Sequence, residues 1–269
     1  MTNTPLDKRT AFVTGSTQGI GLAVAKSLAS AGANVALHGL AAPQEAESAM
    51  AEVRAAGAPD VIFLDHDVSD TKAIDAMLKT LQEWRNIDVL VNNAGMQKTA
   101  SIADATAQLW DAVIAVNLSA PFHIMRALLP GMATRGFGRV INIASVHGLV
   151  ASVDKAPYVS SKFGLVGLSK VAALEYAAKG SKASGGITVN CICPGWTETT
   201  LIQPQVDARA AQFGGDRDLG IADLLSEKQP SKRTSDPSEI GELCLWLCQR
   251  AAHNITGTSI PVDGGWTAQ

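Results

Sequence analysis

Short apolar runs alternate with longer segments of helical periodicity along almost the whole chain. The apolar runs predict strands at 10–14, 34–38, 61–64, 87–91, 140–144, 187–193 and 259–262. Apolar positions spaced three and four residues apart predict helices at 22–31, 46–56, 71–85, 105–125 and 237–250, and another helix near Pro157. Strands that alternate with helices favour an α/β fold with a parallel sheet, whose ligands bind at the carboxyl ends of the strands.

The segment 197–236 departs from this alternation. It is polar, rich in Gln, Asp and Ala, and only weakly helical, and it follows the carboxyl end of the strand at 187–193. An insertion at that position is expected to form a small helical lid over the substrate. No internal repeat or linker interrupts the rest, so residues 1–269 are interpreted as a single domain.

Composition and charge exclude several classes of function. Apolar residues make up 46% and charged residues 17% of the chain, which suits a folded core. The net charge is −3 and no long basic run occurs, so no nucleic-acid partner is expected. The amino terminus has no apolar core typical of a signal peptide, and no apolar run approaches the ~18 residues of a membrane span. We therefore expect a cytoplasmic protein with no membrane partner.

The four cysteines are interpreted as small buried apolar side chains. Their spacings, C-x-C at 191–193 and C-x-x-x-C at 244–248, differ from the two-residue spacing usual in zinc sites. Unpaired thiols fit a reducing compartment. The sequence therefore predicts no metal site.

A glycine-rich turn, 15–21, directly follows the first strand and opens the first helix. Glycines in such a turn let the backbone approach a pyrophosphate, and the helix amino terminus favours its negative charge. The spacing here is G-x-x-x-G-x-G. The position of the turn after the first strand predicts a dinucleotide cofactor.

The end of the second strand favours NAD over NADP. An acidic residue there binds the ribose hydroxyls of NAD, and a basic one favours the 2′-phosphate of NADP. Neither is present at His38-Gly39-Leu40, and the next basic residue is Arg54. His38 itself is interpreted as a polar residue at the edge of the strand. Asp67, at the end of the third strand, is a candidate partner for the adenine amino group.

A serine and a Tyr–Lys pair carry the candidate chemistry. Ser145 follows the strand at 140–144, and Tyr158 and Lys162 are four residues apart, so they share one face of a helix. A phenol has a pKa of about 10, and the ammonium of Lys162 together with an oxidised nicotinamide is expected to lower it. Tyr158 could then exchange a proton with an alcohol or carbonyl, while Ser145 holds the reacting oxygen. Asn117, among apolar residues, needs a hydrogen-bond partner.

Together these motifs resemble the short-chain dehydrogenase/reductase family along nearly the whole chain. The motifs are T-G-x-x-x-G-I-G, D-V, N-N-A-G, N, S, Y-x-x-x-K and P-G-x-x-T, in that order. The resemblance implies a Rossmann-type, doubly wound parallel sheet, a homotetramer, and the catalytic residues Asn117, Ser145, Tyr158 and Lys162. It also implies that the cofactor NAD contacts Gly15, Thr17, Gly19, Ile20, Gly21, Leu40, Asp67, Val68, Asn93, Ala94, Gly95, Tyr158, Lys162, Pro194, Gly195 and Thr197.

Longer segments resemble the bacterial branch of that family that oxidises (R)-3-hydroxybutyrate. They include N-I-A-S-V-H-G-L-V-A-S-V-D-K-A-P-Y and C-P-G-W-T-E-T. This resemblance implies that a small 3-hydroxy acid contacts Gln97, Ser145, His147, Lys155, Tyr158, Trp196 and Gln205. The stretch 178–186 is longer than is usual in that branch, and we expect it to have little effect on the chemistry.

The residue types alone also point to an acid substrate. A carboxylate that leaves water needs charge-assisted hydrogen bonds, and Lys155 and His147 lie within three residues of Tyr158 and Ser145, respectively. Asp154, next to Lys155, is expected to weaken the local positive potential.

Two alternatives to this function remain. One is a reductase of 3-oxoacyl thioesters or of another small alcohol or ketone, and the other is a cofactor-sensing binding protein without catalysis.

Overall fold

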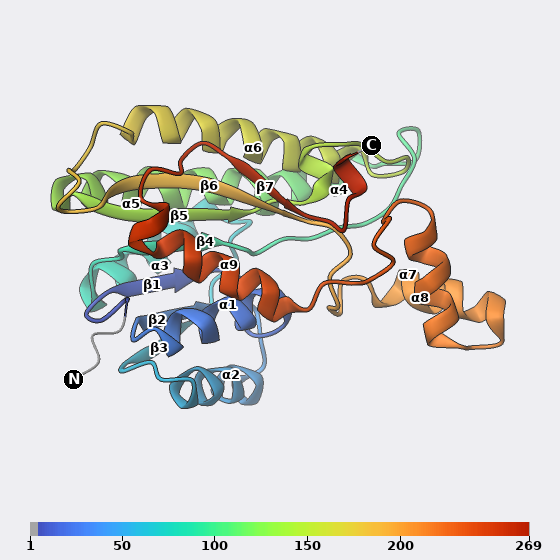
Figure 1. Ribbon diagram of the computed structural model, residues 1–269, viewed down its shortest axis with the longest axis horizontal. Coiled ribbons are helices and arrows are strands. Elements are labelled where there is room, and N and C mark those ends of the chain that lie inside the picture. Colours follow the sequence, from blue (N-terminus) through green and yellow to red (C-terminus); the bar gives the residue numbers. More distant parts are fainter. Residues whose placement is uncertain (1–4, 269) are drawn as a thin grey trace.

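The protein is built around one parallel sheet of seven strands. The computed structural model describes residues 5–268 of the 269. In the described residues the strand order is β3-β2-β1-β4-β5-β6-β7 (Figure 1). The bounds are β1 Thr10–Val13, β2 Asn34–His38, β3 Val61–Leu64, β4 Val89–Asn92, β5 Phe137–Ile143, β6 Gly186–Pro194 and β7 Ser259–Val262. The predicted α/β fold with a doubly wound sheet is confirmed, and each predicted strand is present with shifts of a few residues at its ends.

Helices cover both faces of the sheet and enclose two hydrophobic cores. One core packs α1 (Gly19–Ser30), α2 (Pro43–Ala55) and α9 (Pro237–Cys248) on one face. The other packs α3 (Thr71–Trp84), α5 (Ala120–Arg135) and α6 (Ala156–Tyr176) on the opposite face. Since both faces are covered, strand residues are buried on either side, which explains why the strands are continuous apolar runs.

The helix predicted at 105–125 is divided into three segments. These are α4 (Ala107–Ile114), a π-helical turn η1 (Ala115–Ser119) and α5. In the π turn the Ala120 N–H donates to the Ala115 carbonyl, five residues earlier. Such a wide turn often marks a functional site. The combined segment Ala107–Arg135 is long and apolar enough to cross a membrane by length and composition, but 44% of its most apolar window is buried in this fold.

A pair of short helices projects from the body after β6. These helices, α7 (Gln203–Ala210) and α8 (Arg217–Ser226), lie at one end of the molecule (Figure 1). They enclose a small apolar cluster of their own, formed by Ile202, Val206 and Leu224. Thr197 and Ser235 are paired at the base of the projection, so the chain leaves the body and returns to it at the same place.

Candidate active site

The glycine turn after β1 presents free backbone N–H groups at the start of α1. Gly15 and Gly19 adopt left-handed φ values of 61° and 55°. Gln18, which precedes α1, makes no side-chain cap, and the first turn of the helix contains no acidic residue. The unpaired N–H groups of this turn therefore suit a pyrophosphate, as the sequence predicts.

Hydrogen bonds fasten the glycine turn to the end of β4. The Asn93 amide donates to the carbonyls of Thr14 (3.0 Å) and Gly15 (2.7 Å). Gly21 lies beneath the turn, where an added Cβ would come within 2.1 Å of the Gly15 oxygen. Gly21 is therefore needed for close packing and, unlike the other predicted cofactor residues, does not line the cleft.

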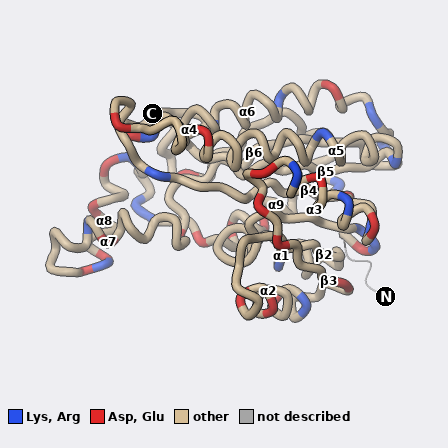
Figure 2. The backbone as a smooth tube through the Cα atoms, turned by 180° about the vertical axis from the view of Figure 1, so that it is seen from behind, with Lys and Arg blue, Asp and Glu red and all other residues tan. Residues whose placement is uncertain are grey.

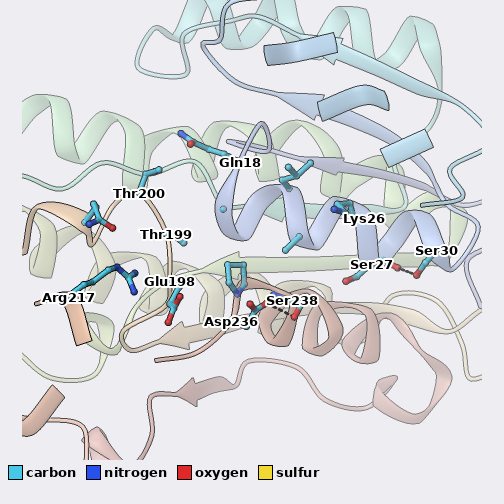
Figure 3. Close-up of a pocket in the computed structure, with 15 residues that line it drawn as sticks. Gln18, Lys26, Ser27, Ser30, Glu198, Thr199, Thr200, Arg217, Asp236 and Ser238 are labelled. Atoms are coloured by element: carbon cyan, nitrogen blue, oxygen red, sulfur yellow. Dashed lines mark hydrogen bonds between the residues drawn. The ribbon is translucent and has the colours of Figure 1, made fainter. Parts of the chain in front are cut away.

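The cleft above this turn has room for a dinucleotide. Its larger part is about 550 Å³, and a smaller part of about 120 Å³ extends toward Tyr158. A separate groove of about 820 Å³ adjoins it between α1 and α9, with Gln18, Thr199 and Thr200 shared by both (Figure 3). The predicted cofactor residues that line the cleft are Gly15, Thr17, Gly19, Ile20, Leu40, Asp67, Val68, Asn93, Ala94, Gly95, Tyr158, Lys162, Pro194, Gly195 and Thr197.

His38 is the last residue of β2, where the sequence placed it, and its buried side chain connects two neighbouring segments. Its Nδ1 accepts a hydrogen bond from the Gly15 N–H (3.2 Å), and its Nε2 lies 2.8 Å from the His66 carbonyl oxygen. These contacts require a neutral ring with the proton on Nε2. Burial lowers the pKa of His38, which favours that neutral form.

Tyr158, Ser145 and Lys162 meet where β5 ends and α6 begins. Pro157 lies in the first turn of α6, and Tyr158 and Lys162 follow on one face of the helix. The Lys162 Nζ lies 5.6 Å from the centre of the Tyr158 ring and donates to the Ile143 carbonyl (2.8 Å). The three residues therefore surround one point at the carboxyl edge of the sheet.

The protonation of this group differs from the sequence expectation. Burial raises the pKa of Tyr158, and a hydrogen bond with Ser145 acts in the opposite direction. Burial also lowers the pKa of Lys162 to about 8. In the protein alone, desolvation of the phenol therefore dominates the pKa of Tyr158, and Lys162 does not produce the lowering that we expected from it together with a nicotinamide.

Asn117 links the π turn to this group. Its side chain accepts from the Met96 N–H (2.9 Å) and donates to the Met96 carbonyl (3.0 Å) and to Ser161 Oγ (3.1 Å). A Cβ added to Gly95 would lie 3.5 Å from Asn117 Oδ1 and 3.8 Å from Lys162 Nζ. The side chains of Asn117 and Lys162 thus lie on the same side of Gly95. The buried amide of Asn117 has the hydrogen-bond partners that the sequence required.

A small cavity of about 60 Å³ lies next to the cofactor cleft. All seven predicted substrate residues line it, namely Gln97, Ser145, His147, Lys155, Tyr158, Trp196 and Gln205. Val146, expected among the cavity residues, contributes to its apolar wall, and sequence reasoning missed the other members of that wall, Leu201, Ile202 and Trp266. The ring of Trp266 stacks near that of Trp196, with 6.2 Å between their centres.

The cavity carries positive charge, and no Asp or Glu of the described residues lines it. The Lys155 Nζ lies 5.6 Å from the centre of the Trp196 ring, and the Lys228 Nζ lies 5.5 Å from that of Trp266. Burial and Lys228 lower the pKa of Lys155. Asp154 is exposed and does not line the cavity, so the expected weakening of the positive potential has no support in these contacts.

His147 is buried in this cavity, and both of its ring nitrogens lack a hydrogen-bond partner. Burial, followed by the charges of Lys155 and Lys228, lowers its pKa to about 4. The Trp196 indole nitrogen is also buried without a partner. Unpaired polar atoms are rare in protein interiors, so these groups indicate a polar ligand.

The low pKa of His147 predicts a specific acid sensitivity of the fold. In the unfolded chain His147 would take up a proton near its ordinary pKa of 6.5, whereas the folded protein resists protonation down to about pH 4. The free energy of unfolding should therefore fall by about 3 kcal/mol from this residue as the pH drops from 7 to about 4. Urea unfolding of the wild type and His147→Gln at both pH values isolates this contribution. Equal pH dependence in the two proteins would contradict it.

The four cysteines are free and buried. Among residues 5–268, no group of three or more His, Cys, Asp or Glu side chains is arranged to hold a metal ion. The site is therefore built from the cofactor cleft, the Tyr158 group and the small cationic cavity.

Comparison with known proteins agrees with this arrangement. Residues 9–210 match the model of the short chain dehydrogenase family. The chain belongs to that family, and the resemblance drawn from its motifs is confirmed. It is an oxidoreductase that uses a nicotinamide cofactor.

Individual relatives share nearly the full length of the chain. It is 45% identical to the D-beta-hydroxybutyrate dehydrogenase of Cupriavidus necator, over 98% of this chain and 100% of the relative. It is 42% identical to the enzyme of the same name from Rhizobium meliloti, over 97% and 99% of the two chains. The solved L-sorbose reductase from Gluconobacter frateurii, complexed with NADPH and L-sorbose, matches 99% of each chain at 28% identity with a TM-score of 0.91.

Proposed function

We propose that the protein oxidises (R)-3-hydroxybutyrate to acetoacetate, reversibly and with NAD. The observation that carries this proposal is the small cavity beside Tyr158, which is lined by Lys155 and an unpaired His147 and has Lys228 close to its Trp266 side. A cavity of about 60 Å³ suits a small molecule, and the uncompensated lysines suit an anion. The names of the two relatives from Cupriavidus necator and Rhizobium meliloti support the same substrate.

Tyr158 is the proposed acid–base group. In the oxidation its phenolate accepts the proton of the substrate hydroxyl, and Ser145 donates a hydrogen bond to the reacting oxygen. The bound dinucleotide supplies the hydride acceptor and a positive charge. Because burial raises the pKa of the phenol in the protein alone, that positive charge and the Lys162 ammonium together favour the reactive phenolate. Asn117, whose side chain lies on the same side of Gly95 as Lys162, is proposed to maintain the proton path.

The remaining cavity residues recognise the two ends of the acid. Lys155, His147, Gln97 and Gln205 surround the proposed carboxylate position, where the one ring N–H of the neutral His147 can donate a hydrogen bond. The stacked ring of Trp196 covers the methyl end. These contacts would orient the reacting carbon of the substrate toward the cofactor. Orientation of this kind supplies a large part of the rate acceleration of an enzyme.

Measuring NADH absorbance with two classes of substrate tests this function. The proposal predicts rapid reaction of free (R)-3-hydroxybutyrate and acetoacetate and slow reduction of 3-oxoacyl thioesters. Fast thioester reduction with poor turnover of free acids would select the reductase alternative. NADH binding without turnover of either class would select a cofactor-sensing protein.

The cofactor cleft supports NAD rather than NADP. No Lys or Arg of the described residues lines the larger part of the cleft, and Leu40, at the end of β2, is 69% exposed. A 2′-phosphate beside Leu40 would have no cation to pair with.

Leu40→Arg is therefore expected to admit NADP. A new charge-assisted contact with the 2′-phosphate should raise kcat/KM for NADP by about tenfold or more. Steady-state kinetics with both cofactors provide the measurement, and Leu40→Gln controls for the loss of the apolar side chain. A wild-type preference for NADP, or no gain in the arginine variant, would contradict the assignment of NAD.

The projecting helices are proposed to form the substrate lid. Ile202 and Gln205, near the start of this segment, line the cavity, and Arg217 faces the groove beside α1 (Figure 3). That groove leaves space for the helices to move toward the body. Closure would remove water from the reacting atoms.

A homotetramer in the cytoplasm completes the proposal. Phe122 of α5 and Phe163, Val171 and Leu174 of α6 are exposed apolar side chains, which a second copy of the chain could cover. Free buried cysteines fit a reducing compartment. Light scattering coupled to size-exclusion chromatography would measure the assembly.

A further inference from the structure

A second cavity lies at the opposite edge of the sheet from the active site. It measures about 560 Å³ and adjoins the amino-terminal ends of β5 and β6. Its lining includes the basic side chains Arg9, Arg139, Lys182, Arg250 and His253 and no Asp or Glu from the described residues. In Figure 2, Lys and Arg segments mark this end of the molecule, away from α7 and α8. The cavity is therefore a basic one with no role in the proposed reaction.

Arg139 provides the second, independent sign of a ligand. Its side chain is only 1% exposed, yet in the described part of the chain it has no carboxylate partner. Its guanidinium donates to the backbone oxygens of Gly138 (2.9 Å), Gly186 (2.9 Å) and Gly185 (3.1 Å), and its Nε has no partner. A buried charge is costly unless an opposite charge lies nearby, so this site lacks a counter-ion.

Neighbouring groups keep the positive charge concentrated. The ring of Phe137 lies 3.8 Å from the guanidinium carbon of Arg9 and 4.5 Å from that of Arg139. Arg9 pairs with Asp88 at 3.3 Å. Lys182 and Arg250 are exposed and form no salt bridge with any described residue. Three cations therefore face the cavity without a compensating acid.

The stretch 178–186 builds one wall of this cavity. Gly180, Gly185 and Gly186 adopt left-handed φ values of 80°, 98° and 62°, which fold the stretch into a tight turn. The Ser181 backbone N–H donates a hydrogen bond to Ser184 Oγ (2.8 Å), which closes the turn. This turn holds Lys182 at the rim of the cavity, far from the residues proposed to carry out the reaction.

We propose that this cavity binds a small, multiply charged oxyanion of the phosphate or carboxylate class. The anion would supply the missing counter-ion of Arg139 and contact Lys182 and Arg250 at the rim. Because it would bind the folded chain and not the unfolded one, it would stabilise the protein. This site is separate from the catalytic cavity, and its existence does not depend on the identity of the substrate.

Titration of the NADH-saturated enzyme tests the proposal. Saturation with NADH keeps the probe away from the glycine turn. Pyrophosphate and citrate are the two probes, at constant ionic strength so that simple screening is held fixed. Calorimetry should show binding of at least one probe, with a rise in Tm. Binding of pyrophosphate alone would assign the phosphate class, and binding of citrate alone the carboxylate class.

A pair of exposed side chains supplies the decisive variant. K182Q/R250Q removes two rim charges without disturbing the core and should weaken the binding by about tenfold or more. The matched control, K72Q/K79Q, removes two exposed lysines of α3 and should bind as the wild type does. Turnover should be unchanged in both variants. The absence of binding by either probe, or equal affinity in K182Q/R250Q and the wild type, would overturn the proposal.

Discussion

Tyr158→Phe is expected to lower kcat by about 10³-fold while NADH still binds. The substitution removes only the phenol oxygen, and the ring of Tyr158 keeps its buried position at the start of α6. Without that oxygen, the site loses the group that is proposed to take the hydroxyl proton beside Ser145. Steady-state kinetics would give the loss of turnover, and NADH fluorescence the affinity for the cofactor.

The other tyrosine of the chain provides the control. Tyr176 lies at the last residue of α6, and it lines neither the cofactor cleft nor the substrate cavity. Tyr176→Phe should retain wild-type turnover. Robust activity of Tyr158→Phe would remove Tyr158 from its proposed role, and loss of NADH binding would show that its role is to hold the cofactor.

Lys155→Ala should raise KM for 3-hydroxybutyrate by about 10- to 100-fold, the value of one charge-assisted hydrogen bond. The kcat should change less, because Lys155 contacts the carboxylate end and not the reacting hydroxyl. Lys228 lies nearby, since its charge lowers the pKa of Lys155, and it would keep part of the attraction.

A variant of the neighbouring Lys98 tests whether Lys155 acts by direct contact with the substrate or only through its contribution to the positive potential. Lys98 is exposed, follows the cavity residue Gln97 directly and does not line the cavity. Lys98→Ala should leave KM close to the wild-type value. An unchanged KM in Lys155→Ala would place the carboxylate elsewhere, and equal increases in the two variants would indicate long-range attraction in place of a direct contact.

The fold was predictable because it depends on local patterns. A parallel sheet covered on both faces needs continuous apolar strands, and each predicted run, such as 34–38, became one. The division of the helix at 105–125 was not predictable from periodicity. The π turn occurs where the Asn117 side chain bonds to Met96, a contact between residues 21 positions apart.

Proximity in sequence explains only part of the site. Ser145, Tyr158 and Lys162 lie within 18 residues and surround one point, whereas the seven proposed substrate residues, which line one cavity, span positions 97 to 205 and came from the family resemblance. Trp266 and Lys228 were missed because only the tertiary fold brings Trp266 to the cavity and Lys228 close to Trp266. The fold also determines burial, which explains why the pKa of Tyr158 is raised in the protein alone. The two hydrogen bonds of His38 were not predictable for the same reason, because its partners Gly15 and His66 follow two other strands, β1 and β3.

The central claim is that the cationic cavity selects a free carboxylate for oxidation beside Tyr158. The most direct test compares the kcat/KM of (R)-3-hydroxybutyrate with that of its methyl ester, which has the same reacting alcohol but no charge. We predict that the ester is poorer by about tenfold or more, because the charge-assisted contact of Lys155 and the attraction of the nearby Lys228 are lost. An ester oxidised as efficiently as the acid would contradict the claim.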